Sequence, residues 1–230
     1  SFGGEICDGR NQADLIIVNT CTVTAEAARK SRQTIRRLRR ECPHAHIVVT
    51  GCYASMTEQI ELHEAGADLV VGNQDKDRLV DRVVTTFQLN PVVCSVDPAE
   101  ILSIRGRDRA FIKIQDGCRY RCAFCIVTIA RGDERSRSIA EIVEEISALH
   151  QAGINEVVLT GVHVGGFGSD NGGSLAQLLR VVLSQTRIPR IRLSSLEPWA
   201  IDEELTALFA EPRIMPHLHL PLQSGSNEVL

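Results

Sequence analysis

The chain has 230 residues, 43% of them hydrophobic, so it is long enough for one or two globular domains with buried cores. Its formal net charge of −4 argues against a protein that coats nucleic acid indiscriminately. No run of 18 apolar residues predicts a membrane helix, and the opening residues SFGGEICDGR lack the pattern of a signal peptide, so we expect a cytoplasmic protein without a membrane partner.

The first half of the chain alternates short apolar runs with helical patterns. The runs DLIIVN, HIVVTG and DLVVGN, at 14–19, 46–51 and 68–73, are rich in valine and isoleucine, and a helical pattern follows each. This alternation favours buried parallel strands over buried helix segments. The sequence therefore predicts a parallel α/β domain over residues 1–88 and a linker at 89–109, where two prolines occur without a clean period.

The second half, residues 110–230, repeats strand and helix in strict succession. Strands are predicted at 111–115, 156–161, 190–195 and 217–222, and helices near 138–151, 174–186 and 199–210. Four such units with large loops after the strands fit part of a parallel β/α barrel better than a closed barrel of eight. The chain starts without Met and stops at NEVL in what looks like the first turn of a helix, so we expect a fragment with an incomplete barrel.

In parallel α/β folds, ligands bind at the carboxyl ends of strands, so the residues that follow predicted strands are candidates for a site. In the second half these positions hold three cysteines and the stretches 161–163, 194–197 and 223–225. In the first half, Cys21 follows the first strand and Cys52 follows the second. Five of the eight cysteines therefore lie where such folds build sites, which favours metal or redox chemistry over a disulfide framework.

The stretch DGCRYRCAFCIV holds Cys118, Cys122 and Cys125, with no fourth cysteine nearby. A structural zinc site needs four ligands, and a zinc loop that borrows a distant ligand stays open as an alternative. Three thiolates at this spacing can bind three corners of a four-iron four-sulfur (4Fe-4S) cluster and leave one iron open. An open iron can hold a substrate or a cofactor.

The order of strand, Cys118-x3-Cys122-x2-Cys125 loop and helix resembles the signature of the radical S-adenosylmethionine superfamily. In that family the open iron chelates S-adenosylmethionine, and the reduced cluster passes it an electron, which implies an electron donor as a partner. The cofactor then splits into methionine and a 5′-deoxyadenosyl radical that abstracts hydrogen from the substrate. The resemblance implies a cofactor pocket lined by Phe124, Thr160, Gly161, Ser195, Glu197 and Gln223.

Further blocks resemble the methylthiotransferases of that superfamily. They are VNTCTVTAEA, TGCYA, QDGCRYRCAFCIV, ARGDERSRS, LTGVHVGGFG, RLSSLEP and HLHLPLQSGS. The implied fold is a flavodoxin-like N-terminal domain followed by a radical S-adenosylmethionine barrel. In this family the N-terminal domain binds an auxiliary 4Fe-4S cluster through three cysteines. Cys21 and Cys52 match two of them, Cys7 does not match the third, and Thr128-Ile129 stand where many members have a proline and an aromatic.

Within the methylthiotransferases, Thr22-Val23-Thr24 and the following ARKSRQ resemble the branch that acts on N6-threonylcarbamoyladenosine next to the tRNA anticodon. The implied reaction uses one S-adenosylmethionine to methylate a sulfur on the auxiliary cluster and a second to remove hydrogen from carbon 2 of the adenine. Activity on isopentenyladenosine or on a ribosomal protein stays an alternative, as does a non-catalytic zinc-binding RNA module. The sequence leaves the sulfur donor and the oligomeric state open.

Basic residues crowd the helical pattern that follows Cys21, and the resemblance to tRNA-modifying enzymes favours their use on RNA phosphates. The candidates for RNA contact are Arg29, Lys30, Arg32, Arg36 and Arg131. Without the resemblance, a charge run is more commonly a solvated helix face. On the same helical pattern, Cys42 continues the apolar stripe and is predicted to lie in the core, whereas Cys94 lies in the linker.

Overall fold

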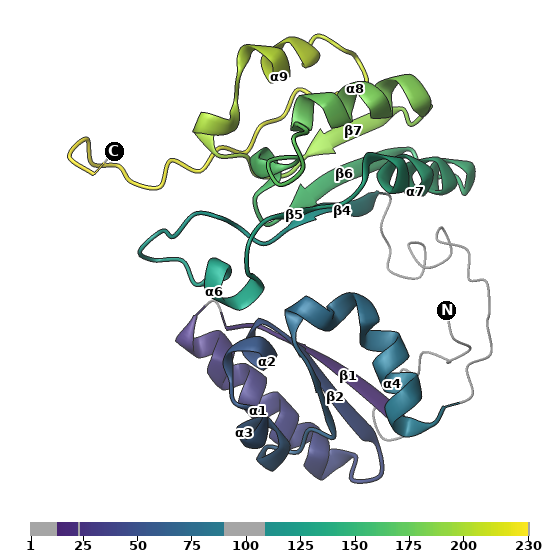
Figure 1. Ribbon diagram of the computed structural model, residues 1–230, viewed down its shortest axis with the longest axis vertical. Coiled ribbons are helices and arrows are strands. Elements are labelled where there is room, and N and C mark those ends of the chain that lie inside the picture. Colours follow the sequence, from purple (N-terminus) through teal and green to yellow (C-terminus); the bar gives the residue numbers. More distant parts are fainter. Residues whose placement is uncertain (1–12, 23, 90–108, 230) are drawn as a thin grey trace. The chain divides into compact units, whose positions relative to one another are not determined.

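Figure 1 shows the computed structural model of the chain, which describes residues 13–22, 24–89 and 109–229. The chain divides into two compact units. One unit holds the described residues up to 89, and the other holds most of those from 109 onward. The exception is Tyr120–Gly132, which belongs to the first unit.

The predicted boundaries do not anticipate this return of the chain to the first unit. A division into 1–88 and 110–230 assigns the whole cysteine loop to the second domain, whereas the loop contributes a short helix to the first unit. Most of the predicted linker, including Cys94, lies outside the described residues.

The first unit contains a parallel sheet with the strand order β1-β2-β3. Its strands are β1 (Leu15–Thr20), β2 (His46–Gly51) and β3 (Leu69–Val71). Its helices are α1 (Ala25–Glu41), α2 (Cys52–Met56), α3 (Gln59–Glu64), the 3-10 helix η2 (Asn73–Arg78), α4 (Leu79–Phe87) and α6 (Val127–Arg131). The three predicted strands are confirmed, and their order follows the chain because helices connect each parallel strand to the next.

Helices cover both faces of this sheet, so all residues of β2 except the first are buried. Helix α1 begins at its cap, Thr24, whose side-chain oxygen accepts a hydrogen bond from the backbone N–H of Ala27. Its apolar stripe buries Ile35 and Leu38 against the sheet. Cys42, at the end of the stripe, is fully buried, which confirms the prediction that it belongs to the core.

The second unit contains a four-stranded sheet with the order β5-β4-β6-β7. Its strands are β4 (Ala110–Asp116), β5 (Arg135–Ser136), β6 (Glu156–Gly161) and β7 (Arg190–Leu193). Its helices are α7 (Ile139–Gln151), the 3-10 helix η3 (Val164–Gly166), α8 (Leu175–Gln185), the 3-10 helix η4 (Pro198–Ala200) and α9 (Glu203–Leu208). Strands β4, β6 and β7 are parallel, and the short β5 pairs antiparallel with the outer side of β4.

The α/β class and three of the four predicted strand-helix units of the second half are confirmed. Helices α7 and α8 are each capped by a serine, Ser138 and Ser174, and pack isoleucine and leucine side chains onto the three parallel strands. The carboxyl ends of these parallel strands lie at one edge of the sheet, where the loops of the candidate site begin. None of the described helices is long and apolar enough to cross a membrane.

The strand predicted at 217–222 is wrong. These residues have no strand structure, and all but Pro221 are exposed. The chain instead pairs with β7 slightly earlier, through a single parallel bridge between Ile191 and Ile214. The alternation of His and Leu resembles a strand pattern, but Pro216 and Pro221 carry no backbone N–H to donate to a ladder.

The end of β2 requires a glycine at position 51, and this requirement can be tested. Gly51 has φ = +100°, and a Cβ atom there would lie 2.2 Å from the carbonyl oxygen of Thr20, at the end of β1. We expect Gly51→Ala to lower the free energy of unfolding by more than the about 1–3 kcal/mol that backbone strain alone costs, because the end of β1 must also move. Chemical denaturation followed by circular dichroism measures the loss.

Gly153→Ala is the matched control. Gly153 also has positive φ, +93°, but nothing lies within 4 Å of the added Cβ. The difference between the two variants isolates the close approach of β1 and β2, and equal losses would contradict it.

Candidate functional site

The parallel register of β1 and β2 brings two predicted ligands to one edge of the first sheet. Thr20 is paired with Gly51, and Cys21 and Cys52 are the next residue along each strand. Cys21 is exposed and Cys52 is buried, and both are free thiols. The two predicted ligands of the auxiliary cluster therefore follow neighbouring strand ends, and Cys7, which does not match the third cysteine of the family, lies outside the described residues.

Hydrogen bonds fix the backbone around these two cysteines. The hydroxyl of Ser31, on α1, donates to the carbonyl oxygen of Cys21 at 3.0 Å, and the N–H of Cys21 returns a bond of 3.3 Å to that hydroxyl. The side-chain oxygen of Thr20 accepts a 3.2 Å hydrogen bond from the N–H of Ala54, in α2. Both thiols are thus carried on backbone that helices of the first unit hold in place.

The loop Tyr120–Gly132 carries two of the three cysteines of the predicted radical cluster. Cys122 and Cys125 are joined by a turn, in which the N–H of Cys125 donates to the carbonyl oxygen of Cys122 at 3.0 Å. Phe124, between them, is 78% exposed, so this apolar side chain is available to cover a bound group. The hydroxyl of Thr128 donates to the carbonyl oxygen of Tyr120 and closes the loop at the start of α6.

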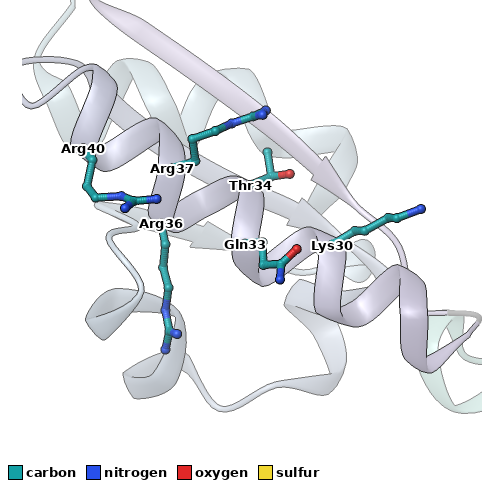
Figure 2. Close-up of a pocket in the computed structure, with 6 residues that line it drawn as sticks. All are labelled: Lys30, Gln33, Thr34, Arg36, Arg37 and Arg40. Atoms are coloured by element: carbon teal, nitrogen blue, oxygen red, sulfur yellow. The ribbon is translucent and has the colours of Figure 1, made fainter.

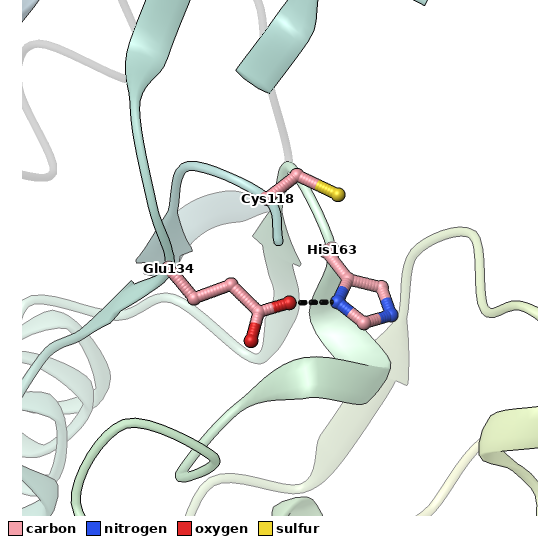
Figure 3. Close-up of side chains that lie close together, drawn as sticks. All are labelled: Cys118, Glu134 and His163. Atoms are coloured by element: carbon pink, nitrogen blue, oxygen red, sulfur yellow. Dashed lines mark hydrogen bonds and ion pairs between the residues drawn. The ribbon is translucent and has the colours of Figure 1, made fainter. Parts of the chain in front are cut away.

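Cys118 is described with the second unit, where it has two partners that the sequence did not single out as ligands. Figure 3 shows its side chain beside those of Glu134 and His163. The Sγ of Cys118, a carboxylate oxygen of Glu134 and a ring nitrogen of His163 all lie within 4.8 Å of one another. Cysteine, glutamate and histidine are also ligands that zinc accepts.

A buried histidine lies between two carboxylates at this edge of the second sheet. Nδ1 of His163 makes a hydrogen bond to Glu134, and its Nε2 lies 3.2 Å from Oε2 of Glu197. The second contact is an ion pair without the direction of a good hydrogen bond. Glu134 also accepts a hydrogen bond from Ser169 and lies 3.7 Å from Nε of Arg119.

Burial and ion pairing shift the pKa values of His163 and Glu134 in opposite directions. Burial alone lowers the pKa of His163, but its pairing with the carboxylates of Glu197 and Glu134 outweighs burial and holds the pKa above its usual value. Burial alone raises the pKa of Glu134, but hydrogen bonds from Ser169 and His163 and the charge of Arg119 leave that pKa lowered. The arrangement therefore favours an imidazolium between two carboxylates.

Glycines make room for this group. A Cβ atom on Gly166 would lie 2.3 Å from Nδ1 of His163 and 2.6 Å from Oε1 of Glu134. A Cβ atom on Gly165 would lie 3.3 Å from Oε2 of Glu197. The two adjacent glycines of the block LTGVHVGGFG therefore lie in η3, close to the side chains of His163, Glu134 and Glu197.

Gln115 joins the cysteine loop to the loop after β6. Its side chain is fully buried, and its Oε1 accepts hydrogen bonds from the backbone N–H groups of Val162 and His163, at 3.1 and 2.9 Å. Its Nε2 donates to the carbonyl oxygen of Gly117 at 2.8 Å, directly before Cys118. Gln115 therefore fixes the spacing between two loops of the predicted cofactor pocket.

The other predicted pocket residues follow the same strand ends to different degrees. Thr160 and Gly161 end β6, and Glu197 contacts His163 as described. Ser195 is exposed and makes a 2.7 Å hydrogen bond with Nδ1 of His219. Gln223 is also exposed, with a positive φ of 67°, and lies beyond the last paired segment.

The basic residues predicted for RNA contact differ in how their charges are compensated. Arg29 and Lys30 both lie near Glu26, at 2.9 and 3.6 Å, and Arg32 lies 3.3 Å from Glu61. Arg131, the last residue of α6, is half-buried.

Arg36 is exposed, and within the described part of the chain neither it nor Arg40 forms an ion pair. Figure 2 shows the basic face of α1 on which they lie. The residues of that face are Lys30, Gln33, Thr34, Arg36, Arg37 and Arg40. The uncompensated charges of α1 are therefore shifted toward its carboxyl end relative to the predicted set.

Sequence reasoning missed Glu134, Gln115 and the bonding role of His163. His163 was placed at a strand end but given no function, and Glu134 appeared only within the block ARGDERSRS. For Gln115 and His163, the available signal was a polar side chain in a segment that is otherwise apolar or rich in glycine, whereas Glu134 stands among other charged residues. Their partners are 29 to 48 residues away in sequence, so no local spacing could have paired them.

Comparisons with known proteins agree with the two-part reading of the chain. Residues 1–72 match the family described as "Uncharacterized protein family UPF0004", and residues 112–230, more than half of the chain, match the "Radical SAM superfamily". A radical S-adenosylmethionine domain uses a 4Fe-4S cluster and S-adenosylmethionine, so these are the cofactors of the second match.

Curated relatives match almost the whole chain. "Threonylcarbamoyladenosine tRNA methylthiotransferase MtaB" of Bacillus subtilis is 38% identical, over 99% of this chain and 53% of that protein. The protein of the same name from Aquifex aeolicus is 38% identical, over 99% and 58%. A "tRNA-2-methylthio-N(6)-dimethylallyladenosine synthase" of Psychrobacter is 32% identical, over 98% and 51%. The chain spans about half the length of the curated relatives it matches.

A solved structure supports the fold. The radical S-adenosylmethionine methyltransferase TsrM of Kitasatospora setae superposes with a TM-score of 0.63 at 18% identity, over 93% of this chain and 49% of that one. The curated relatives are named as methylthiotransferases, and the match over more than half of the chain shows that the chain belongs to the radical S-adenosylmethionine superfamily.

Proposed function

We propose that this chain carries the cluster-binding part of a tRNA methylthiotransferase, which adds a methylthio group to carbon 2 of N6-threonylcarbamoyladenosine next to the anticodon. The observation that carries the proposal is the three-cysteine loop directly after β4, within the residues that match the radical S-adenosylmethionine superfamily. The relatives named for this tRNA nucleoside support the substrate. A tRNA substrate implies the cytoplasm, and the reaction needs an electron donor.

The donor groups suit the proposed clusters. Cys118, Cys122 and Cys125 are exposed or half-exposed, and three thiolates leave one iron of a 4Fe-4S cluster for S-adenosylmethionine. Cys21 and Cys52 are free thiols at neighbouring strand ends, and they are the proposed ligands of an auxiliary cluster.

The bound cluster and S-adenosylmethionine supply the radical chemistry, and the protein supplies orientation and exclusion of water. Gly161 ends β6, the parallel neighbour of β4, and Glu197 follows β7, which pairs with the other side of β6, as expected for residues that hold the cofactor. His163 keeps Glu197 and Glu134 in fixed positions, and Gln115 fixes the loop that begins at Gly161. The exposed ring of Phe124 is suited to cover the cofactor from water.

The basic face of α1 is the proposed contact for RNA phosphates. Arg36 and Arg40 are exposed and carry charge that no ion pair compensates among the described residues. Lys30 and Arg37 add positive charge to the same face of α1. Arginine side chains can bind phosphate oxygens through two hydrogen bonds, so this surface suits an RNA backbone.

One observation favours a different metal. Cys118, Glu134 and His163 are close enough together to bind zinc, which keeps a non-catalytic zinc-binding RNA module as a second candidate. Zinc would have to displace the existing hydrogen bond between Glu134 and His163. Metal content separates the two candidates.

The first prediction concerns that metal content. After anaerobic reconstitution, we expect Cys118→Ala, Cys122→Ala and Cys125→Ala together to remove about four irons and a matching amount of acid-labile sulfide, because one 4Fe-4S cluster loses its ligands. Iron that remains in this triple variant, and disappears when Cys21→Ala and Cys52→Ala are added, reports the auxiliary cluster.

Cys42→Ala is the control for the metal measurement, since Cys42 is a buried core cysteine that precedes β2, whereas Cys21 and Cys52 follow the carboxyl ends of strands. It should retain the iron content of the unmodified chain. Zinc in the unmodified chain, without iron and lost on His163→Leu, would overturn the enzyme proposal and support the zinc module.

The second prediction concerns His163 as a positioning residue. His163→Leu removes one partner of the buried carboxylate of Glu134, so we expect the chain to lose about 3 kcal/mol of stability. Adding Glu134→Leu to the same protein should recover part of this loss, because the buried charge of Glu134 is then absent. Urea denaturation measures both, with His217→Leu, on an exposed segment, as the control.

A double variant no more stable than His163→Leu alone would contradict the charge argument. It would show that the loss comes from packing around the histidine rather than from the unpaired carboxylate of Glu134.

The third prediction concerns RNA binding by α1. With an anticodon stem-loop RNA as the probe, Arg36→Ala with Arg40→Ala should weaken binding and reduce the slope of log K against log salt by about 1.4, or about 0.7 for each lost phosphate contact in single-stranded RNA. Arg78→Ala with Arg82→Ala removes the same charge from the end of η2 and from α4 and serves as the matched control. Equal losses of RNA affinity in both double variants would show that the effect comes from net charge rather than from the basic face of α1.

A further inference from the structure

Asn73 is a buried amide that contacts one of the proposed auxiliary ligands. It is the first residue of η2, and only 7% of its surface is exposed. Its Nδ2 lies 3.5 Å from Sγ of Cys52 and 3.0 Å from the carbonyl oxygen of Ala130, in α6. All three residues belong to the first unit.

We propose that Asn73 is a positioning residue that donates a hydrogen bond to the Cys52 thiolate and ties this ligand to the helix that follows Cys125. This inference rests on the proposed auxiliary cluster. It assigns a residue that neither the spacing of the cysteines nor their position at strand ends identifies.

The orientation of the amide follows from its partners. The carbonyl oxygen of Ala130 can only accept a hydrogen bond, so the NH₂ group of Asn73 must face it. The same NH₂ group has a second hydrogen for Cys52 Sγ, and a thiolate accepts it better than a neutral thiol does. One amide can therefore serve both the ligand and the helix.

The backbone of Asn73 is fixed independently of its side chain. Its N–H donates to the hydroxyl of Ser55 at 2.8 Å, and this hydroxyl in turn donates to the carbonyl oxygen of Gly51 at 3.2 Å. Gly51 ends β2 directly before Cys52. The amide is thus held against the same strand end that carries the thiol, which limits how far the two can separate.

The hydrogen bond to sulfur has a chemical consequence. Reduction adds negative charge to an iron–sulfur cluster, and N–H donors to its sulfur ligands stabilise that charge and raise the reduction potential. Asn73 is suited to this effect because Cys52 is itself only 6% exposed, so water competes little for the sulfur.

The contact with Ala130 adds a mechanical link. Ala130 is buried, and α6 begins two residues after Cys125. One side chain therefore touches the ligand of one proposed cluster and the helix beside the ligand loop of the other. A displacement of Cys52 on cluster binding is expected to reach α6 through this amide.

The test uses Asn73→Leu, which keeps the side-chain size and removes both donors. In the 230-residue chain with Cys118, Cys122 and Cys125 replaced by Ala, only the proposed auxiliary cluster remains, and its midpoint potential is measured by a redox titration followed by electron paramagnetic resonance. We expect a lower potential in Asn73→Leu at unchanged iron content. Gln74→Leu makes the same chemical change one residue later, at an exposed position of η2, and should leave the potential unchanged.

A second readout needs no cluster. In the metal-free chain, we expect Asn73→Leu to speed hydrogen exchange of the Ala130 and Gly132 amides several-fold, because α6 loses its anchor, and Gln74→Leu to have no effect. These amides donate to Ile126 and Thr128 within and just after α6, so they report that helix directly.

The outcomes separate this inference from the proposed function. A reconstituted cluster whose potential does not change in Asn73→Leu overturns the hydrogen bond to the ligand, and unchanged exchange overturns the link to α6. If the triple variant with Asn73 intact binds no iron, the result counts against the auxiliary cluster itself. The role of Asn73 in tuning the potential of that cluster then fails as well.

Discussion

Parallel pairing of strands is the constraint on which both proposed sites depend. A parallel strand must be followed by a crossover, and all crossovers of one sheet begin at the same edge. The register of β1 with β2 therefore sets the positions of Cys21 and Cys52 before any metal is present. The register of β4 with β6, and of β6 with β7, likewise brings the loops that begin after Asp116, Gly161 and Leu193 to one edge. The clusters need only side chains added to a frame that backbone hydrogen bonds already specify.

Much of this frame could be predicted from periodicity, whereas the polar contacts within it could not. Runs of valine and isoleucine identify buried strands because a central parallel strand has no polar face. The thiol spacing from Cys118 to Cys125 is local and could be read directly. Glu134 and His163 meet only because two loops fold onto each other across 29 residues, and no local pattern contains that information. The strand predicted at 217–222 failed for the opposite reason. Its alternation of apolar and polar residues is a local pattern, but a strand also needs a neighbouring strand, and this segment pairs with none among the described residues.

The two charged regions illustrate different uses of the same side chains. On α1, arginines at helical spacing form ion pairs with exposed glutamates, which are worth little and leave the outer face positive. At His163 the carboxylate of Glu134 is buried, so removing one partner is costly and the geometry is held tightly. A count of charges in the sequence cannot distinguish these cases, because burial decides which ion pairs constrain the structure.

The contact between Asn73 and Ala130 spans 57 residues of the chain. During synthesis, the three strands of the first sheet leave the ribosome well before Ala130 does. At that stage α6 has not yet been synthesised. The amide of Asn73, beside the thiol of Cys52, and the face of α2 that α6 covers therefore lack their partner. Domains generally fold as units while the chain grows, but the first unit of this protein cannot be completed in that order. The last step of its folding must wait until residue 130 has been synthesised, so the nascent chain exposes an incomplete surface beside the thiol of Cys52.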